Sequence, residues 1–128
     1  MYAAQKLYQT LSVASRIEAA SPHELVTILY EELIKALEVS RAALVQGKPD
    51  ALQTSRRRAS SILVALDASL DVEQGGALAL SLAQIYRSMQ KEIAAAVQSK
   101  EAARLEAVRK GVADLLSAWL QIGVLRAA

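Results

Sequence analysis

Apolar residues recur at steps of three and four along most of the chain, and the breaks in this pattern separate four long helices. The first predicted helix begins at Pro22, because Ser21 is a favourable N-cap and a proline at the first helical position loses no hydrogen bond. It ends near Gln46, before a glycine suited to helix termination. The other three helices are expected from Asp50 to before the DVEQGG stretch, from Ala77 to Gln98, and after Ser99 as an N-cap.

Short joints between long helices favour antiparallel neighbours, with Gly75 and Gly76 forming the second joint. The fold class predicted is all-α, an antiparallel up-and-down four-helix bundle. We expect one domain over residues 1–128, in which residues 1–20 form an N-terminal arm or cap helix and residues 21–123 form the bundle.

Small side chains must fill the interior of this bundle. Hydrophobic residues make up 53% of the 128 residues, yet Phe is absent and Tyr and Trp number only four and one. The chain has no cysteine, which suits a reducing compartment and favours the cytoplasm. The N-terminus lacks the features of a signal peptide, and no apolar run reaches the ~18 residues of a membrane span, so membrane insertion is not expected.

The first helix carries more apolar residues than one buried face of about 100° requires. One stripe contains Leu25, Ile28 and Leu29, and further apolar positions such as Tyr30 and Leu33 widen it. We therefore expect a groove between the first and third helices that accepts another amphipathic helix. Two alternatives remain open, that neighbouring Ala-rich helices bury both flanks or that the chain forms a homodimer.

Residue patterns for catalysis, metals or nucleotides are scarce. His23 is the only histidine, and no glycine pattern for phosphate binding occurs, so no cofactor is expected. We expect His23 to be a solvated turn residue. The acids of 67–73 lack the spacing of a calcium loop, so no metal is expected either. The arginines of SRRRAS (55–60) lack interleaved aromatic residues, which favours a solvated face over a nucleic-acid site.

Several short motifs, found in order over nearly the whole chain, resemble those of the flagellar secretion chaperone family. They are Tyr8, ASPHEL followed by ILYEE, RASSIL, SLDVEQGGALALSLAQIYRSM, and a late AWLQI. Each motif is weak alone, but their order and spacing together are specific.

The resemblance implies a cytoplasmic helical bundle, not an enzyme, that binds the disordered C-terminal segment of flagellin and prevents its premature polymerisation. It also implies delivery to a component of the flagellar export gate. The tail would wrap around the bundle as short helices, each placing apolar side chains in a groove. The expected partner-binding residues are Leu29, Leu33, Leu82, Ile85 and Tyr86, with Ile28, Ile62 and Leu66 as residues that could equally belong to the core.

In this family the N-terminal arm can lie over part of the binding surface. Tyr8, Leu11 and Val13 give the arm the amphipathic character needed for such a removable cover. The alternative is a frayed terminus without a role. Two other functional classes also remain open, a homo-oligomeric helical bundle and a nucleic-acid-binding module based on the arginine triplet.

Overall fold

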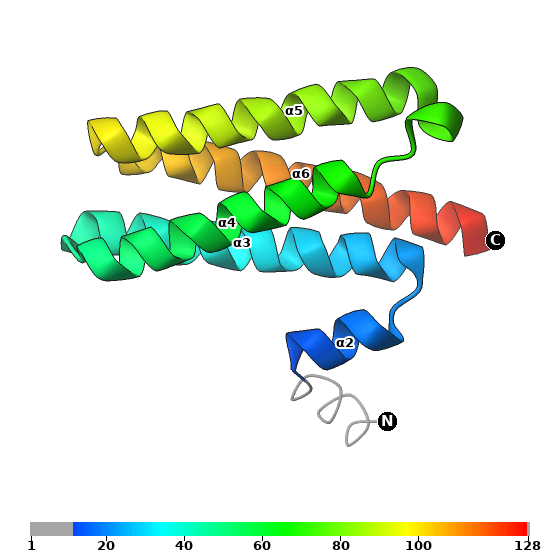
Figure 1. Cartoon of the computed structure of the whole chain (residues 1–128), viewed down its shortest axis with the longest axis horizontal. Coiled ribbons are helices and arrows are strands. Elements are labelled where there is room, and N and C mark those ends of the chain that lie inside the picture. The colour runs from blue at the N-terminus through cyan, green and yellow to red at the C-terminus, as the bar shows by residue number, and fades with distance from the viewer. Residues whose placement is uncertain (1–11, 128) are drawn as a thin grey trace.

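The computed structural model describes the backbone of residues 12–127 and the side chains of residues 12–122. Within this range every regular element is an α-helix, which confirms the all-α prediction. One short helix precedes four long ones that run side by side (Figure 1). The helices are α2 (Val13–Ala19), α3 (Pro22–Gln46), α4 (Pro49–Ala68), α5 (Val72–Ser99) and α6 (Ala102–Ala127).

Helix α3 has the ends that its sequence predicts. The Ser21 hydroxyl oxygen accepts a hydrogen bond from the Glu24 backbone N–H at 3.2 Å, and Pro22 occupies the first turn. At the other end Gly47 adopts a left-handed conformation with φ 66°, and its N–H bonds to the Ala43 and Leu44 carbonyls. Glycine adopts the left-handed conformation without the steric cost that a Cβ atom brings, so α3 ends at this position.

The ends of α5 differ from the prediction. The helix begins at Val72 rather than Ala77, because the Asp71 carboxylate caps the Gln74 N–H at 3.2 Å. The predicted Gly75–Gly76 joint is instead a kink inside α5, where Gly76 has φ 51° and ψ −127°. Ser99, the predicted N-cap of the fourth helix, is the last residue of α5, and its hydroxyl donates to the Ala95 carbonyl at 2.8 Å.

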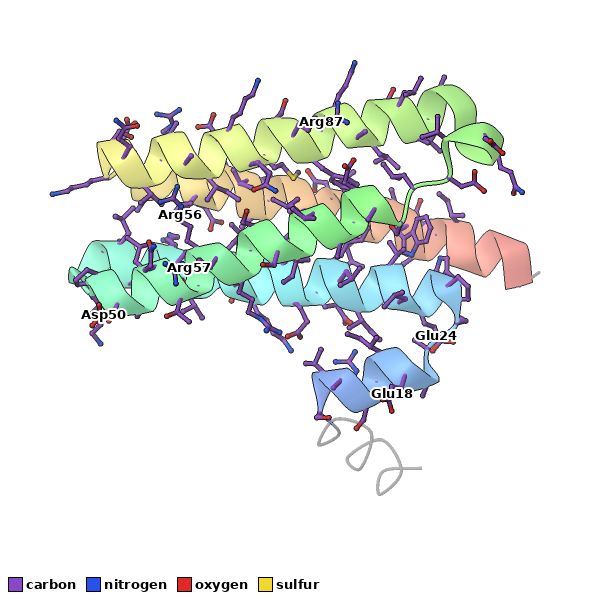
Figure 2. All side chains as sticks on the ribbon, viewed as in Figure 1. Glu18, Glu24, Asp50, Arg56, Arg57 and Arg87 are labelled. Carbon is purple, nitrogen blue, oxygen red and sulfur yellow. The ribbon has the colours of Figure 1, made fainter. Side chains whose placement is uncertain are left out.

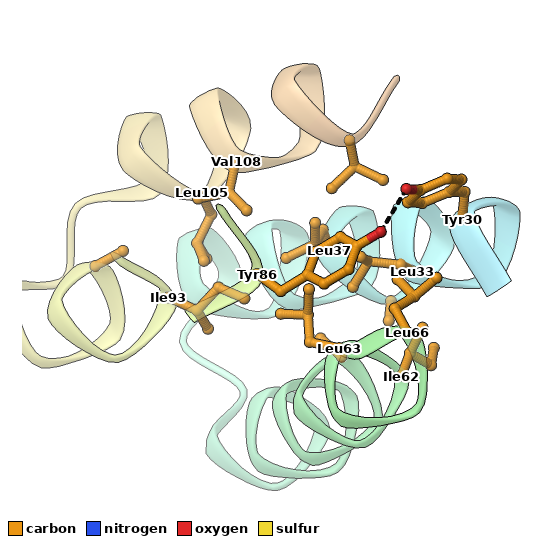
Figure 3. Packing of buried hydrophobic residues seen from close by; sticks show 14 residues of the cluster. Tyr30, Leu33, Leu37, Ile62, Leu63, Leu66, Tyr86, Ile93, Leu105 and Val108 are labelled. Carbon is orange, nitrogen blue, oxygen red and sulfur yellow. Dashed lines mark hydrogen bonds between the residues drawn. The ribbon is translucent and has the colours of Figure 1, made fainter. Parts of the chain in front are cut away.

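The core lies where the four long helices meet. Helix α3 packs against α4 and α6, and α5 packs against the same two helices, so α3 and α5 lie diagonally opposite each other. Side chains of these two helices meet across the core at Tyr30 and Tyr86, whose hydroxyl oxygens are 2.6 Å apart (Figure 3). The largest core side chains are Tyr30, Leu33, Leu37, Ile62, Leu63, Leu66, Tyr86, Ile93, Leu105, Val108 and Val112.

The apolar excess of α3 is largely covered by this chain's own helices. Tyr30, Leu33 and Leu37 are buried, while Val26, Ile34 and Leu44 pack against the same core. Helix α3 is more enclosed than α4 or α5, with eight buried residues against five in each of them, and it has α4 on one flank and α6 on the other. For α3, therefore, the structure supports the alternative in which neighbouring helices bury both flanks.

Candidate functional site

No groove runs along the surface between the first and third predicted helices, because α3 and α5 face each other across the core. Side chains of both helices do meet at a hollow at one end of the bundle, described below. The exposed fraction of Leu33 is 0%, so it is a core residue, whereas Tyr86 is 3% exposed and forms part of the wall of that hollow. Ile28, Ile62 and Leu66 are buried as well, but Ile28 and Ile62 also line the hollow under α2 described below. A helix rotated by a few tens of degrees would have exchanged these roles, and periodicity alone does not fix that rotation.

An open apolar groove lies instead between α5 and α6. It is lined by Ile85 and Met89 of α5, by Ala107, Val108 and Gly111 of α6, and by the polar side chains of Ser81, Gln84, Ser88 and Glu92. Ile85 is 38% exposed, so it projects into the groove, whereas Met89 is half-buried on its floor. Small residues on α6 leave room for a partner backbone to approach closely. Of the residues predicted to bind a partner, Ile85 lines this groove.

Helices α3 and α4 form a second groove, and α2 lies along one half of it. The hollow there, about 390 Å³, is lined by Val13 and Ile17 of α2, by Ile28 and Leu29 of α3, and by Ile62 of α4. None of the seven residues of α2 is buried. The Arg16 guanidinium pairs with the Glu31 carboxylate at 3.1 Å. Helix α2 is thus held by partly exposed apolar contacts and by Arg16, whose side chain is only 15% exposed. Tyr8 and Leu11, also predicted for this arm, lie outside the described residues.

A buried ion-pair cluster divides the α3–α4 groove in two. The Glu32 carboxylate accepts from the Arg58 guanidinium at 2.9 Å and from the Lys35 ammonium at 3.0 Å. Burial alone would raise the pKa of Glu32, but hydrogen bonds and positive charge from Lys35 and Arg58 outweigh it, so the pKa lies below its ordinary value. Beyond the cluster the groove stays open over Ala36, Val39 and Thr54.

A third hollow, of about 440 Å³, lies at the end of the bundle where α4 joins α5. The hydrogen-bonded Tyr30–Tyr86 pair lines it, together with apolar side chains from α3, α5, α6 and the turn between α4 and α5. Burial raises the pKa of Tyr30 and, with Tyr30 as neighbour, raises the pKa of Tyr86 still further, so both hydroxyls keep their protons. The apolar lining residues are Val26, Leu70, Leu78, Ala79, Leu82 and Trp119, which include the predicted Leu82.

His23 and Trp119 fix α6 to the start of α3 beside this hollow. Their rings stack with centroids 4.5 Å apart and an interplanar angle of 9°. The Trp119 indole N–H donates to the His23 carbonyl at 3.0 Å, and the His23 Nε2 is 3.1 Å from the Trp119 carbonyl. The prediction that His23 is a solvated turn residue is therefore wrong. The sequence signal was the position of Trp119 on the apolar seam of the last helix, but nothing in the spacing pointed to residue 23.

The described residues contain no group of three or more side chains that could hold a metal ion. Nor does any helix in that range combine the length and apolar character that crossing a membrane requires. The arginine triplet is divided among different surroundings, because Arg58 pairs with Glu32, Arg56 is half-buried and Arg57 is exposed on α4 (Figure 2).

Comparison with known proteins adds family evidence to this geometry. The family model described as "Flagellar protein FliS" matches residues 4–125. The flagellar secretion chaperone FliS of Salmonella typhimurium is 34% identical over 125 residues, covering 95% of this chain and 93% of the relative. The flagellar secretion chaperone FliS of Vibrio cholerae is 33% identical over 115 residues, covering 90% of this chain and 85% of the relative. The flagellar secretion chaperone FliSB of Pseudomonas aeruginosa is 29% identical over 121 residues, covering 93% of this chain and 96% of the relative. The resemblance seen in the sequence motifs is thus confirmed, and the chain belongs to the FliS family of flagellar secretion chaperones.

Proposed function

We propose that this chain binds the disordered C-terminal segment of flagellin in the cytoplasm, keeps it from polymerising, and hands it to a component of the flagellar export gate. Family membership supports the chaperone role, and the relatives carry that role in their names. The single structural observation that carries the proposal is the open apolar groove between α5 and α6.

A partly exposed apolar stripe on α5 suits a helical guest. Leu78, Leu82, Ile85 and Met89 follow one another at steps of four, three and four, so they form one stripe along the side of α5 that faces α6. Leu78 is 63% exposed, so the bundle leaves part of this stripe uncovered. An amphipathic helix of the tail would cover it by placing its own apolar side chains between α5 and α6.

Helix α2 serves in this proposal as a displaceable cover of a second binding surface. Its Val13 and Ile17 lie over Ile28, Leu29 and Ile62 in the α3–α4 groove, where a second helix of the tail would make similar contacts. Because α2 has no buried residue, exchanging it for a longer guest helix costs little. A tail that wraps both grooves gains the area that offsets its ordering entropy, about 2–5 kcal/mol in coupled folding.

The test is a charge placed in the α5–α6 groove. Ile85→Glu should weaken binding of a flagellin C-terminal peptide by at least about tenfold in calorimetry, because a carboxylate would be buried against apolar side chains. The matched control is Leu80→Glu, which changes an exposed leucine of the same helix that lines none of the grooves described above. Both variants should keep the wild-type thermal midpoint. Equal peptide affinity of the two variants would contradict the assignment of this groove.

A further inference from the structure

The Tyr30–Tyr86 pair holds one more hydrogen-bond donor than the described residues use. Each hydroxyl is buried, with exposed fractions of 2% and 3% for the two residues, and their oxygens are 2.6 Å apart. Two hydroxyls carry two protons, but one contact uses only one of them. Neither oxygen has any other hydrogen-bonding partner among the described side chains and backbone groups. One O–H therefore has no acceptor among those residues and can donate to a guest.

This spare donor belongs to the wall of a hollow with room for a guest. Both tyrosines line the hollow at the end of the bundle, whose 440 Å³ far exceeds the ~30 Å³ that one water molecule occupies. Around the pair the lining is mostly apolar, with Leu78, Leu82 and Trp119 on the side of α5 and α6. A guest that fits must therefore combine an apolar group with one hydrogen-bond acceptor.

The hollow also continues the α5–α6 groove. Leu78 and Leu82 line the hollow, and the next two residues of the same stripe, Ile85 and Met89, line the groove. A guest helix in the groove would thus point one end at the hollow. The last four carbonyls of any helix lack partners within that helix, so a helix C-terminus supplies the acceptor that the tyrosine pair lacks.

We propose that the hollow is an end pocket of the flagellin-binding groove, in which the tyrosine pair donates a hydrogen bond to a free carbonyl at the C-terminus of a guest helix. This inference rests on the proposed function. An apolar side chain from the last turn of the guest contacts Leu78, Leu82 and Trp119. The pocket thereby fixes the direction and register of a helix that an apolar groove alone would let slide.

The first test removes the donors without changing the shape of the pocket. The double variant Tyr30→Phe/Tyr86→Phe should bind a flagellin C-terminal peptide about tenfold more weakly, because the guest carbonyl loses its partner. Its thermal midpoint should equal or exceed that of the wild type, since replacing both members of a buried polar pair by apolar groups of the same shape is nearly neutral. Each single variant keeps one hydroxyl able to donate to the guest, so its affinity should fall by less than that of the double variant.

The second test blocks the pocket from its rim. Gln74 is exposed and lines the hollow, so Gln74→Trp should fill its mouth and weaken peptide binding, while the backbone N–H of that residue can still donate to the Asp71 cap. Glu73→Trp is the matched control, because the neighbouring exposed residue does not line the hollow. Nuclear Overhauser contacts from the Tyr30 and Tyr86 ring protons to the peptide should be present in the wild-type complex.

The outcomes separate this inference from the proposed function. If the wild type binds the peptide but the double Phe variant and Gln74→Trp bind it equally well, the end pocket is wrong and the chaperone proposal stands. A peptide that fails to bind the wild type overturns both. A double variant with lower affinity and an unfolded or strongly lowered thermal midpoint would show the hydroxyl pair to be structural, and would also refute the pocket.

Discussion

Replacing Glu32 by glutamine tests the buried ion-pair cluster that divides the α3–α4 groove. The substitution keeps the size and shape of the side chain but removes its charge. In the native protein the carboxylate accepts from Arg58 at 2.9 Å and from Lys35 at 3.0 Å, and its side chain is only 7% exposed. The glutamine amide would still offer an oxygen to one of them, but its N–H₂ group would face a positively charged group.

The expected loss follows from the exposure of the three side chains. A hydrogen bond to a charged group contributes about 1.5–3 kcal/mol when buried. Here Arg58 and Lys35 are 53% and 65% exposed, so solvent screens part of the interaction. We therefore expect Glu32→Gln to lower the free energy of unfolding by about 1–2 kcal/mol at pH 7. For a domain of this size that corresponds to a thermal midpoint lowered by about 4–7 °C.

The assay is thermal unfolding followed by circular dichroism between pH 7 and pH 3. The pKa of folded Glu32 lies below its unfolded value, so its charge stabilises the fold fully above the unfolded pKa of about 4.3. This stabilisation is lost as the pH falls through the lower, folded pKa. The gap between wild type and variant should thus stay constant from pH 7 to pH 5 and close toward pH 3.

The control is Glu38→Gln, which removes a charge from an exposed residue of the same helix that forms no direct ion pair among the described residues. This control should change the free energy of unfolding by less than about 0.5 kcal/mol. A Glu32→Gln variant as stable as wild type at pH 7, or a gap that persists unchanged at pH 3, would refute the reasoning, because the charge would then contribute nothing to stability.

Three further outcomes follow from the same structure. Deleting residues 1–20 should uncover Leu29 and its neighbours under α2, which raises the binding of a hydrophobic dye and the affinity for the flagellin peptide; unchanged dye fluorescence would count against the cover. Lys100→Gly should raise the free energy of unfolding by about 1 kcal/mol in urea titration, because Lys100 has φ 57° and only glycine adopts that conformation without cost. Peptide affinity should change less than about threefold between roughly 50 and 200 mM salt, because the grooves are mainly apolar, whereas the steep salt dependence of a nucleic-acid site would favour the arginine triplet.

The elements that the sequence predicts correctly are those set by neighbouring residues. Ser21 and Gly47 determine the ends of α3 through hydrogen bonds within one helical turn, so a local pattern suffices to find them. The prediction of where α5 starts is wrong for a related reason. One helical turn, capped by Asp71, precedes Gly76, and a single turn is too short to show an apolar periodicity. A helix end that depends on a single capping side chain can be predicted only when the residues around the cap also show a helical pattern.

The grooves could not be predicted because they depend on how each helix is rotated in the bundle. Leu33 and Ile85 both lie beside apolar stripes, yet one is buried and the other is exposed. The difference arises because α3 has closely packed neighbours on two flanks, while the α5 stripe extends beyond the contact with α6. Which helices become neighbours depends on the tertiary structure. For the same reason, the many apolar residues of the first predicted helix led us to expect an exposed binding stripe on α3 that its neighbours in fact bury.

Core packing and the proposed binding of a guest therefore depend on different residues, even where these lie on one helix. A charge at Leu33 of α3 would enter the core and unfold the protein, so such a variant could not report on partner binding. A charge at the 38% exposed Ile85 of α5 would meet water in the free protein, and under the proposal it would meet apolar side chains only in the complex. Exposed apolar residues contribute little to the stability of the free bundle. The uncovered stripe of α5 thus remains available to a guest without weakening the core around α3, and substitutions there separate affinity from stability.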